Sequence, residues 1–247
     1  MRLSILQPSY LPWLGFFDQM HRADTFVFLD DVQFTRRDWR NRNKIRTRNG
    51  WAWLTVPVLQ KSRFKQLLKE TRIDNSIPWR RKHREAIRSN YAQTPFFDLY
   101  FPSLQSVYNK RWDFLLDLCY ETLQILQEAL GIQALILKAS EIGIESARKE
   151  KILALCQTLE ASHYLTGDSA ADYLCPQEFD RLGIVLEMQN YRHPSYHQRY
   201  PGFVAYLSVI DLLFNEGERS LAVLSGAHQK ADESFAGENE NQKKPPC

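Results

Sequence analysis

The 247-residue sequence predicts an α/β fold, in which a mainly parallel, Rossmann-like sheet is flanked by helices and a helical portion lies in the middle of the chain. Three observations lead to this prediction. Short β-branched, aromatic and aliphatic runs alternate with longer segments of helical periodicity. The first run, residues 3–6, leads into a Pro- and Gly-shaped turn and an amphipathic helix, the βα start typical of such sheets. A hydrophobic content of 44% and a charged content of 25% are those of a globular protein.

The element boundaries follow from apolar runs, periodicity and capping residues. We expect strands at residues 3–6, 25–29, 51–58, 132–137, 163–166 and 184–188. We expect a first helix that ends at about residue 21, and further helices at residues 78–90, 112–130, 147–159, 170–182 and 203–215. Residues 1–224 should form a single α/β domain with a helical insertion at about 60–130. From residue 225 the chain is small, polar and charged, which predicts a disordered tail over residues 225–247.

The composition argues against several classes of protein. No apolar run approaches ~18 residues, so we expect no membrane span, and the apolar run at residues 3–6 is too short for a signal peptide. The four cysteines have no CxxC or paired spacing, which indicates reduced thiols and a cytoplasmic location. His193, His197 and Cys175 lack the spacing of a four-ligand zinc site, so we assign no metal-binding residues, and the sequence leaves the cofactor open.

The turn after the first strand is the first candidate site. The carboxyl end of a strand and the start of a helix meet there, which is the usual seat of a ligand in an α/β sheet. Gln7, Tyr10 and Trp13 are expected to line a pocket, where the Gln amide reads a polar group and the aromatic rings stack on the ligand. The alternative is that Pro8 and Pro12 shape the turn while the aromatic side chains pack in the core.

Two adjacent carboxylates close the second predicted strand. Because neighbouring residues of a strand face opposite ways, one of Asp30 and Asp31 should face the site and the other should cap the turn or contact solvent. The one that faces the site is a candidate base, magnesium ligand or partner of an amino group. Gln33 would share a face with Asp31 if the chain stayed extended. A simple turn capped by an Asp side chain is the alternative.

A block of cations follows these carboxylates. Seven cations and one acid, Asp38, lie between residues 36 and 48, and Trp39 among them permits stacking of a base or sugar. Because the block is local and the net charge is only +3, a single phosphorylated small molecule explains it more economically than nucleic acid. A solvated basic surface is the alternative. The candidate anion-binding residues are Arg36, Arg40, Asn41, Arg42 and Lys44.

The strand at residues 163–166 runs into a Thr-Gly-Asp-Ser turn and a helix. Backbone N–H groups at such a turn are suited to an anion, and Tyr173 would face the same cleft about one helical turn later. The alternative is a plain N-cap at Asp168 or Ser169. The substrate-binding candidates of this segment are Thr166, Gly167, Ser169 and Tyr173.

The segment before the last predicted helix holds the remaining candidates. His193 is a candidate general base, because an imidazole titrates near the working pH. Tyr196 and Gln198 are candidate substrate contacts in the same segment. Ser208 and Asp211 lie on one face of the predicted last helix and are either site residues or polar groups of that helix. No G-x-S-x-G elbow occurs, so we predict no Ser-His-Asp triad.

Four blocks of the chain resemble one protein family. They are QPSYLPWLGFFDQMHRADTFVFLDDVQFTRRDWRNRNKI, LTVPV, HYLTGDSAADYL and YHQRYPGFVAYLSVIDLLFNEG. They resemble the WbqC-like protein family over essentially residues 1–224. The resemblance implies a cytoplasmic enzyme that modifies amino sugars for bacterial surface polysaccharides or acts in a related small-molecule pathway.

The most concrete activity that the resemblance implies is a transferase that N-acylates or aminoacylates a nucleotide-linked amino sugar. In this scheme the basic block holds the phosphates, and Gln7, Tyr10 and Trp13 form the pocket. Asp30, Asp31 or His193 positions or deprotonates the attacking amine. The expected partner is a small, phosphorylated substrate, with a homodimer or a carrier protein as further possibilities.

Two alternatives remain open from the sequence. The first strand, turn and helix are similar to the opening of nucleotidylyltransferase-type α/β enzymes such as pantothenate synthetases. Those enzymes carry a Pro-x-His-x-Gly-His signature, whereas Trp13 and Phe16 replace both histidines here. The fold analogy is therefore stronger than the chemical one. The other alternative is a non-catalytic protein that binds a nucleotide, sugar or RNA.

Overall fold

The centre of the structure is a five-stranded sheet whose strands are all parallel. The structure is a computed structural model that describes residues 1–36, 38–60, 66–146, 148–172 and 174–226. The strand order is β5-β2-β1-β6-β7, so the order along the sheet reverses between β1 and β6. This is the Rossmann-like order, and it confirms the predicted fold class. The strands are β1 (Arg2–Leu6), β2 (Thr25–Phe28), β5 (Leu135–Lys138), β6 (His163–Thr166) and β7 (Val185–Met188).

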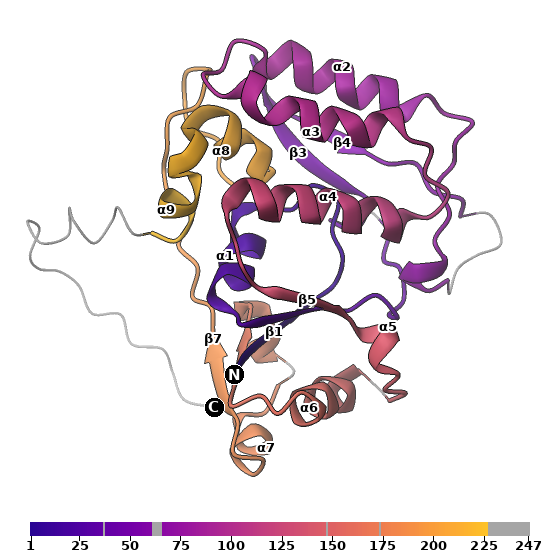
Figure 1. Cartoon of the computed structure of the whole chain (residues 1–247), viewed down its shortest axis with the longest axis vertical. Helices are drawn as coiled ribbons and strands as arrows, with labels where there is room; N and C mark the ends of the chain where they lie inside the picture. The colour runs from indigo at the N-terminus through magenta and orange to yellow at the C-terminus, as the bar shows by residue number, and fades with distance from the viewer. Residues whose placement is uncertain (37, 61–65, 147, 173, 227–247) are drawn as a thin grey trace, which may run out of the picture.

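Helices cover both faces of this sheet (Figure 1). Successive residues of β2 and of the position after it point to opposite faces of the sheet, where they enter two separate hydrophobic cores. Phe26 and Phe28 belong to one core, and Val27 and Leu29 belong to the other. Burial on both faces explains why the strands read as continuous apolar runs. The helices that connect the strands are α1 (Leu14–Arg22), α5 (Ala139–Ile142), α6 (Arg148–Thr158) and α7 (Pro176–Asp180).

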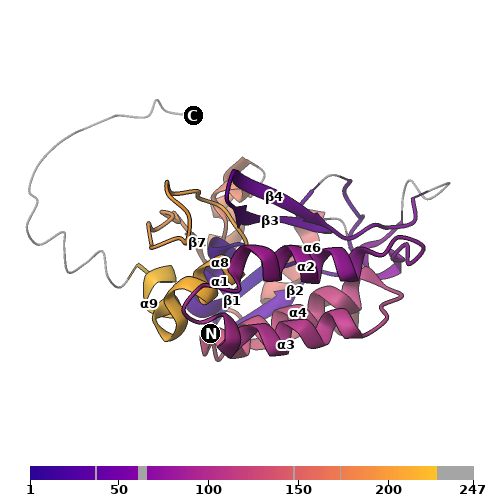
Figure 2. The ribbon, with the colours of Figure 1, turned by 90° about the horizontal axis from the view of Figure 1, so that it is seen from above.

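A helical layer lies between β2 and β5 in the chain, where the sequence predicts a helical portion. Figure 2 shows this layer from above, with α2 (Trp79–Tyr91) between α3 (Phe97–Asn109) and the hairpin of β3 (Arg42–Thr47) and β4 (Gly50–Thr55). Its last helix ends at Gly131 in a left-handed conformation (φ 70°), as expected for a C-cap. The sequence did not indicate α3, because Pro102 interrupts its pattern. The layer contains η1 (Leu68–Glu70), α2 (Trp79–Tyr91), α3 (Phe97–Asn109) and α4 (Leu115–Leu130), and the C-terminal α8 (Val209–Glu216), η3 (Gly217–Arg219) and α9 (Ser220–Leu224) complete it.

The strand predicted at residues 51–58 belongs to a separate hairpin. β3 (Arg42–Thr47) and β4 (Gly50–Thr55) pair antiparallel and form a two-stranded sheet of their own. β3 coincides with the basic block, whose alternating cations concealed the strand. The hairpin therefore displays part of the basic block as a pleated surface.

Two predicted helices differ from those in the structure. Residues 170–182 contain the end of η2 (Asp168–Asp172) and then α7, because Pro176 disfavours a helical residue before it and starts a new helix. Residues 203–208 are not helical, because Tyr206 has a positive φ of 58° and Ser208 caps the helix that starts at Val209. From residue 227 the predicted tail lies outside the described residues. None of the described helices combines the length and apolarity that crossing a membrane requires.

Candidate functional site

A cavity of about 480 Å³ opens at the carboxyl ends of β1 and β6, where the strand order reverses. Ligands of open α/β sheets bind at this position, because the loops that follow the two strands diverge there. Its wall combines aromatic rings with amides and hydroxyls. The lining residues are Ile5, Leu6, Gln7, Ser9, Trp13, Phe16, Gln19, Leu29, Trp39, Arg40, Ile152, Tyr164, Thr166, Gly167, Asp168, Ser169, Ala170, Gln189, Tyr191 and Tyr206.

A second cavity of about 600 Å³ lies between α3, α4 and α8. Its wall is mainly apolar, with Leu104, Ile125, Leu126 and Phe214 among its members. Its wall also includes the polar residues Ser106, Glu121 and Glu128, but all of its lining residues lie on helices and none at the end of a strand. We therefore take the cavity at the strand ends as the candidate site.

The turn after β1 is held by the guanidinium of Arg40. Its Nη1 atom donates to the carbonyl oxygens of Gln7 (3.1 Å) and Pro8 (3.2 Å) and to Ser9 Oγ (3.2 Å). Nε forms an ion pair with Asp38 at 3.4 Å. Arg40 therefore holds the turn after β1 that forms part of the cavity wall, and its own side chain also lines the cavity.

Aromatic rings form one wall of the cavity. The Trp13 ring packs against Tyr191 (centroids 5.5 Å apart) and Tyr206 (5.7 Å). It lies across Gly15 so closely that a Cβ there would be 2.2 Å from the ring. Trp39, from the segment before β3, adds a further indole to the lining.

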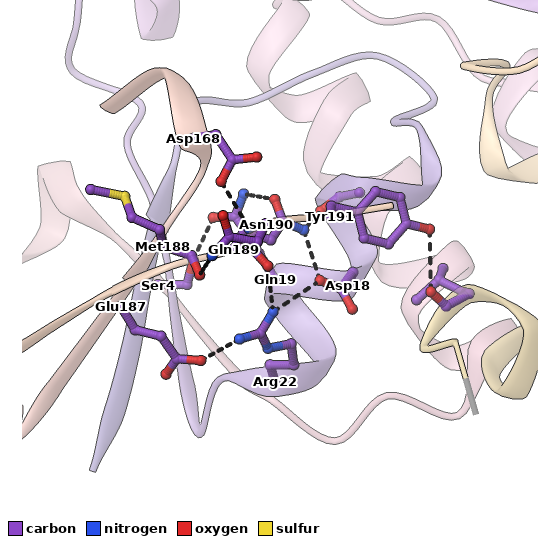
Figure 3. A network of polar contacts seen from close by, with 12 residues as sticks. Ser4, Asp18, Gln19, Arg22, Asp168, Glu187, Met188, Gln189, Asn190 and Tyr191 are labelled. Atoms are coloured by element: carbon purple, nitrogen blue, oxygen red, sulfur yellow. Dashed lines mark hydrogen bonds and ion pairs between the residues drawn. The ribbon is translucent and has the colours of Figure 1, made fainter. Parts of the chain in front are cut away.

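A chain of buried amides connects α1 to the end of β7 (Figure 3). Ser4 Oγ donates to Gln19 Oε1 (3.1 Å), and Gln19 Nε2 donates to Gln189 Oε1 (2.8 Å). Gln189 Nε2 donates to Gly15 O (2.7 Å) and to Asp18 Oδ2 (2.8 Å). Burial raises the pKa of the Asp18 carboxyl, while the hydrogen bond from Gln189 and the charge of Arg22 act in the opposite direction.

Arg22 attaches this chain of amides to β7. Its Nη1 donates to the carbonyl oxygen of Gln189 (3.0 Å), and Nη2 forms an ion pair with Glu187. On the β6 side, the backbone N–H of Asn190 donates to Asp168 Oδ1 at 2.8 Å. The turns after β6 and β7 are therefore tied together, and the floor and one rim of the cavity form a connected polar unit (Figure 3).

The structure places several predicted site residues on the cavity wall and others elsewhere. Those on the wall are Gln7, Trp13, Arg40, Thr166, Gly167 and Ser169. Tyr173 lies outside the described residues. The remaining candidates fall into four groups, which are the residues after β2, the histidine, the buried polar residues and the basic block, in which Arg36 is exposed and Arg42 and Lys44 are half-buried.

The two carboxylates after β2 are both engaged away from the cavity. Asp30 is 1% exposed and accepts hydrogen bonds from the backbone N–H (2.9 Å) and Oγ (2.6 Å) of Ser140, so it holds the start of α5. Asp31 forms an ion pair with Lys151 on α6. Gln33 is exposed and joins Leu67 in an isolated bridge. The expectation that Asp30 or Asp31 faces the ligand does not fit this geometry.

His193 lies behind the aromatic wall and is absent from the cavity lining. Its Nε2 accepts from the backbone N–H of Tyr206 (3.1 Å), so the proton of the neutral ring resides on Nδ1, which donates to Pro194 O (2.9 Å). Burial lowers the pKa of His193, which favours this neutral form. Its ring is stacked with Trp13 at 6.5 Å. His193 is thus suited to positioning the wall.

Four predicted contact residues are structural in this fold. Tyr10 is fully buried, and its hydroxyl bonds to His83 Nδ1 (2.9 Å) and Tyr108 (2.7 Å). Asn41 Nδ2 donates to Val56 O (2.7 Å). Tyr196 OH (2.8 Å) and Gln198 Nε2 (2.9 Å) both donate to the buried carboxylate of Asp211. For Tyr10 and Asp211 these are the core alternatives that the sequence left open.

The basic block forms a surface next to the cavity, which we call the indole–cation face. It comprises Trp39, Arg42, Lys44, Trp51 and Trp53. Lys44 Nζ lies 4.4 Å from the centroid of Trp51 and 5.2 Å from that of Trp53, and the Arg42 guanidinium lies 4.2 Å from Trp53. Trp39 is 5.5 Å from Trp53 and also lines the cavity, so it joins the two features.

Sequence reasoning missed several residues of the cavity wall. Gln189 directly follows β7, as Gln7 directly follows β1, so a glutamine directly after a predicted strand was the available signal. Gln19 interrupts the apolar face of α1, and its polarity among Phe16, Phe17 and Met20 was a second signal. Asp168 was considered only as a cap. Among the described residues, no three His, Cys, Asp or Glu side chains are grouped as a metal site requires.

The fold is that of a Rossmann-like α/β protein with a cavity at the topological switch point of its sheet. The chain belongs to the WbqC-like protein family, which matches residues 7–223. A relative in Mycobacterium tuberculosis (strain ATCC 25618 / H37Rv), named "Uncharacterized protein Rv1507c", is 35% identical over 218 residues, which is 87% of this chain and 94% of the relative. No solved structure was found to match the chain. The family expected from the sequence is thereby confirmed.

Proposed function

We propose that this protein is a transferase that modifies a nucleotide-linked amino sugar, by N-acylation or aminoacylation of its amine, in polysaccharide or related biosynthesis. The sugar occupies the cavity, and the nucleotide extends onto the indole–cation face. One observation carries the proposal. The polar and aromatic cavity at the switch point is continuous, through Trp39, with a surface of indoles and cations.

The wall of the cavity suits a sugar. Sugar hydroxyls donate and accept, and amides and hydroxyls of Gln7, Gln19, Ser9 and Thr166 offer both functions around the space. Trp13 and Tyr206 offer apolar ring faces for the C–H side of a pyranose. A volume of about 480 Å³ lies within the range of small-molecule sites.

The adjoining face suits a phosphate-bearing group. The ammonium of Lys44 and the guanidinium of Arg42 are held over indole rings, which keeps two cations in fixed positions. Arg binds phosphate bidentately, and an exposed indole such as Trp51, 46% exposed, stacks on a nucleobase. A single nucleotide explains these stacking rings and cations more economically than a longer nucleic acid.

The carboxylate on the cavity wall is Asp168, and we assign it the role of base. An ammonium must lose a proton before its nitrogen attacks an acyl carbon, and a carboxylate within hydrogen-bond reach accepts that proton. The N–C bond forms as the bond between the acyl group and its leaving group, in a thioester or acyl phosphate, breaks. Asp168 replaces Asp30, Asp31 and His193 in this scheme, because their side chains have other partners.

A non-catalytic binding protein is the second candidate function. It is favoured by one observation, which is that all three residues expected to be catalytic are engaged in the fold. The two functions differ in the fate of the bound ligand. A binding protein releases the sugar nucleotide unchanged, whereas a transferase increases its mass by the acyl group.

The experiment measures binding and turnover with one ligand. UDP-glucosamine is titrated into the wild type and into Lys44→Gln, with Arg48→Gln on the same hairpin as the matched loss of charge. We expect a higher melting temperature on binding, a dissociation constant raised about tenfold in Lys44→Gln, and little change in Arg48→Gln. Mass spectrometry after addition of acyl-CoAs then detects acylation. Binding without a mass change supports the second candidate, and no binding of any sugar nucleotide contradicts both.

A further inference from the structure

The orientation of the buried amides is fixed by acceptors that cannot donate. Gln189 Nε2 lies 2.7 Å from the carbonyl oxygen of Gly15 and 2.8 Å from the carboxylate of Asp18. Both are acceptors, so this end of the Gln189 amide must be the NH₂ group, and both of its hydrogens are used. Its Oε1 atom therefore faces Gln19, whose nearer atom must be the donor Nε2 (2.8 Å).

The same argument fixes the orientation of the Gln19 side-chain amide and leaves one of its N–H groups without an acceptor among the described residues. Its Oε1 accepts from Ser4 Oγ at 3.1 Å, and one hydrogen of Nε2 goes to Gln189. An amide nitrogen carries two hydrogens, and no described residue accepts the second. Gln19 is only 4% exposed and lines the cavity. The second hydrogen of Nε2 is therefore accessible only from the cavity.

The turn after β6 leaves room beside this donor. A Cβ on Gly167 would lie 3.3 Å from Gln19 Nε2, and both residues belong to the cavity wall. A side chain at position 167 would therefore crowd the nitrogen from the cavity side. Gln19 bonds to both Ser4 and Gln189, and Figure 3 shows these three residues close together, with Asp168 on the neighbouring turn.

We propose that Gln19 determines ligand specificity by donating its second Nε2 hydrogen to an oxygen of the ligand, a hydroxyl or carbonyl, at the floor of the cavity. A buried donor without an acceptor costs free energy, and a ligand oxygen relieves that cost whereas an ammonium does not. Asp168 lies on the wall of the same cavity and has the opposite polarity, since it only accepts. The site therefore orients a ligand with an oxygen at Gln19 and an amine towards Asp168.

This inference rests on the proposed function and narrows it. For an amino sugar, it requires a hydroxyl of the sugar ring at Gln19 and directs the reacting nitrogen away from the chain of buried amides. Ser4, Gln189 and Asp18 do not touch the ligand in this scheme. They are positioning residues that keep the donor of Gln19 pointed into the cavity.

The test compares two changes at Gln19 with the same change at a remote site. Gln19→Glu turns the donor into an acceptor, Gln19→Met removes it without adding charge, and Gln133→Glu alters an exposed residue before β5. UDP-glucosamine is the probe. We expect a dissociation constant at least about tenfold higher in both Gln19 variants, and within about twofold of wild type in Gln133→Glu.

Spectroscopy of the wild type provides a readout that does not depend on the folding of a variant. In protein labelled with ¹⁵N-glutamine, the Gln19 side-chain amide is assigned by its loss in Gln19→Met, or by its contacts to Ser4 if that variant does not fold. Bound UDP-glucosamine should shift one of its two hydrogen resonances more than either hydrogen of Gln189. Wild-type affinity in folded Gln19→Met, or an unshifted Gln19 amide in the bound protein, overturns this inference while the proposed function stands. A wild type that binds no sugar nucleotide overturns the proposed function instead.

Discussion

The indole ring of Trp13 lies across the Cα of Gly15, and a Cβ built on that glycine would stand 2.2 Å from Cη2 of the ring. The two residues start α1, and the ring continues into the wall of the cavity. The glycine at this position is therefore explained by the close approach of a side chain, and the aromatic wall depends on it.

We expect Gly15→Ala to destabilise the protein and weaken ligand binding. In a helix with free space, this change stabilises by up to about 1 kcal/mol, but overpacking against the indole should cost about 1–3 kcal/mol. Urea unfolding and the dissociation constant for UDP-glucosamine measure the two effects. The same substitution in a Trp13→Ala background should be neutral or stabilising. Equal losses in both backgrounds would contradict the steric explanation.

A second prediction concerns the buried carboxylate of Asp211. It is 0% exposed and accepts from the hydroxyls of Tyr91 (2.9 Å) and Tyr196 (2.8 Å). Burial raises the pKa of Asp211 to about 6, although these hydrogen bonds oppose the shift. The folded state then binds a proton more tightly than the unfolded state, whose carboxyl titrates near 3.9.

The Asp211 contribution to stability is therefore complete below about pH 4 and is lost as the pH rises through about 6. Two pKa units correspond to about 3 kcal/mol. Asp211→Asn cannot ionise, so the free energy of unfolding of wild type relative to this variant should fall between pH 4 and pH 7. Denaturant titrations at several pH values give this difference. A difference that stays constant over this range would show that the carboxyl keeps its ordinary pKa.

His83 should produce the opposite pH dependence. Burial lowers its pKa to about 4, and its ring bonds to Tyr10 OH (2.9 Å) and Thr55 O (3.1 Å). Because the carbonyl only accepts, Nε2 carries the proton of the neutral ring and Nδ1 accepts from Tyr10. Between pH 6.5 and pH 4 the unfolded state binds the proton first, so this contribution to stability is lost as the pH falls, by about 3 kcal/mol in total.

The variant that checks this prediction is His83→Gln, which does not titrate. The free energy of unfolding of wild type relative to His83→Gln should decrease as the pH falls from 7 to 4. The free energy of unfolding of wild type relative to Asp211→Asn should increase over the same range. Because the two groups act in opposite directions, their contributions to the pH dependence of the free energy of unfolding of the wild type should largely cancel. If both differences in the free energy of unfolding changed in the same direction with pH, the direction of the pKa shift inferred for His83 or for Asp211 would be wrong.

The parallel sheet and the location of the cavity were predictable, because both depend on local patterns. Apolar runs marked the strands, and polar residues at their carboxyl ends, such as Gln7 after β1 and Thr166 at the end of β6, lie on the cavity wall. The partners of the other candidates were not predictable from local patterns. Asp30 bonds to Ser140, which lies 110 residues later in the sequence, and Asp31 bonds to Lys151, which lies 120 residues later. Tertiary packing decides whether such a carboxylate is structural or faces a ligand.

The hairpin illustrates a different limit of sequence reasoning. Charged residues alternate along β3, and a charge pattern does not reveal that the opposite face is buried through Asn43 and Ile45. The basic block therefore appeared as a cluster of cations in sequence and is a pleated surface in the structure. Cations that are close in sequence divide between the cavity (Arg40), the indole–cation face (Lys44) and the interior (Arg46).

Arg40 carries the last prediction, because one guanidinium nitrogen holds three acceptors of the β1 turn within 3.2 Å. Lys keeps the charge but replaces the planar fork with a single ammonium that does not span these groups in the same geometry. We expect Arg40→Lys to increase hydrogen exchange of the backbone amides of Gln7, Ser9 and Tyr10 and to raise the dissociation constant for UDP-glucosamine about tenfold. The control is Arg48→Lys, which makes the same change at an exposed residue in the turn between β3 and β4. If Arg40 served only as a positive charge, the lysine variant would retain wild-type affinity and the turn would exchange at the wild-type rate.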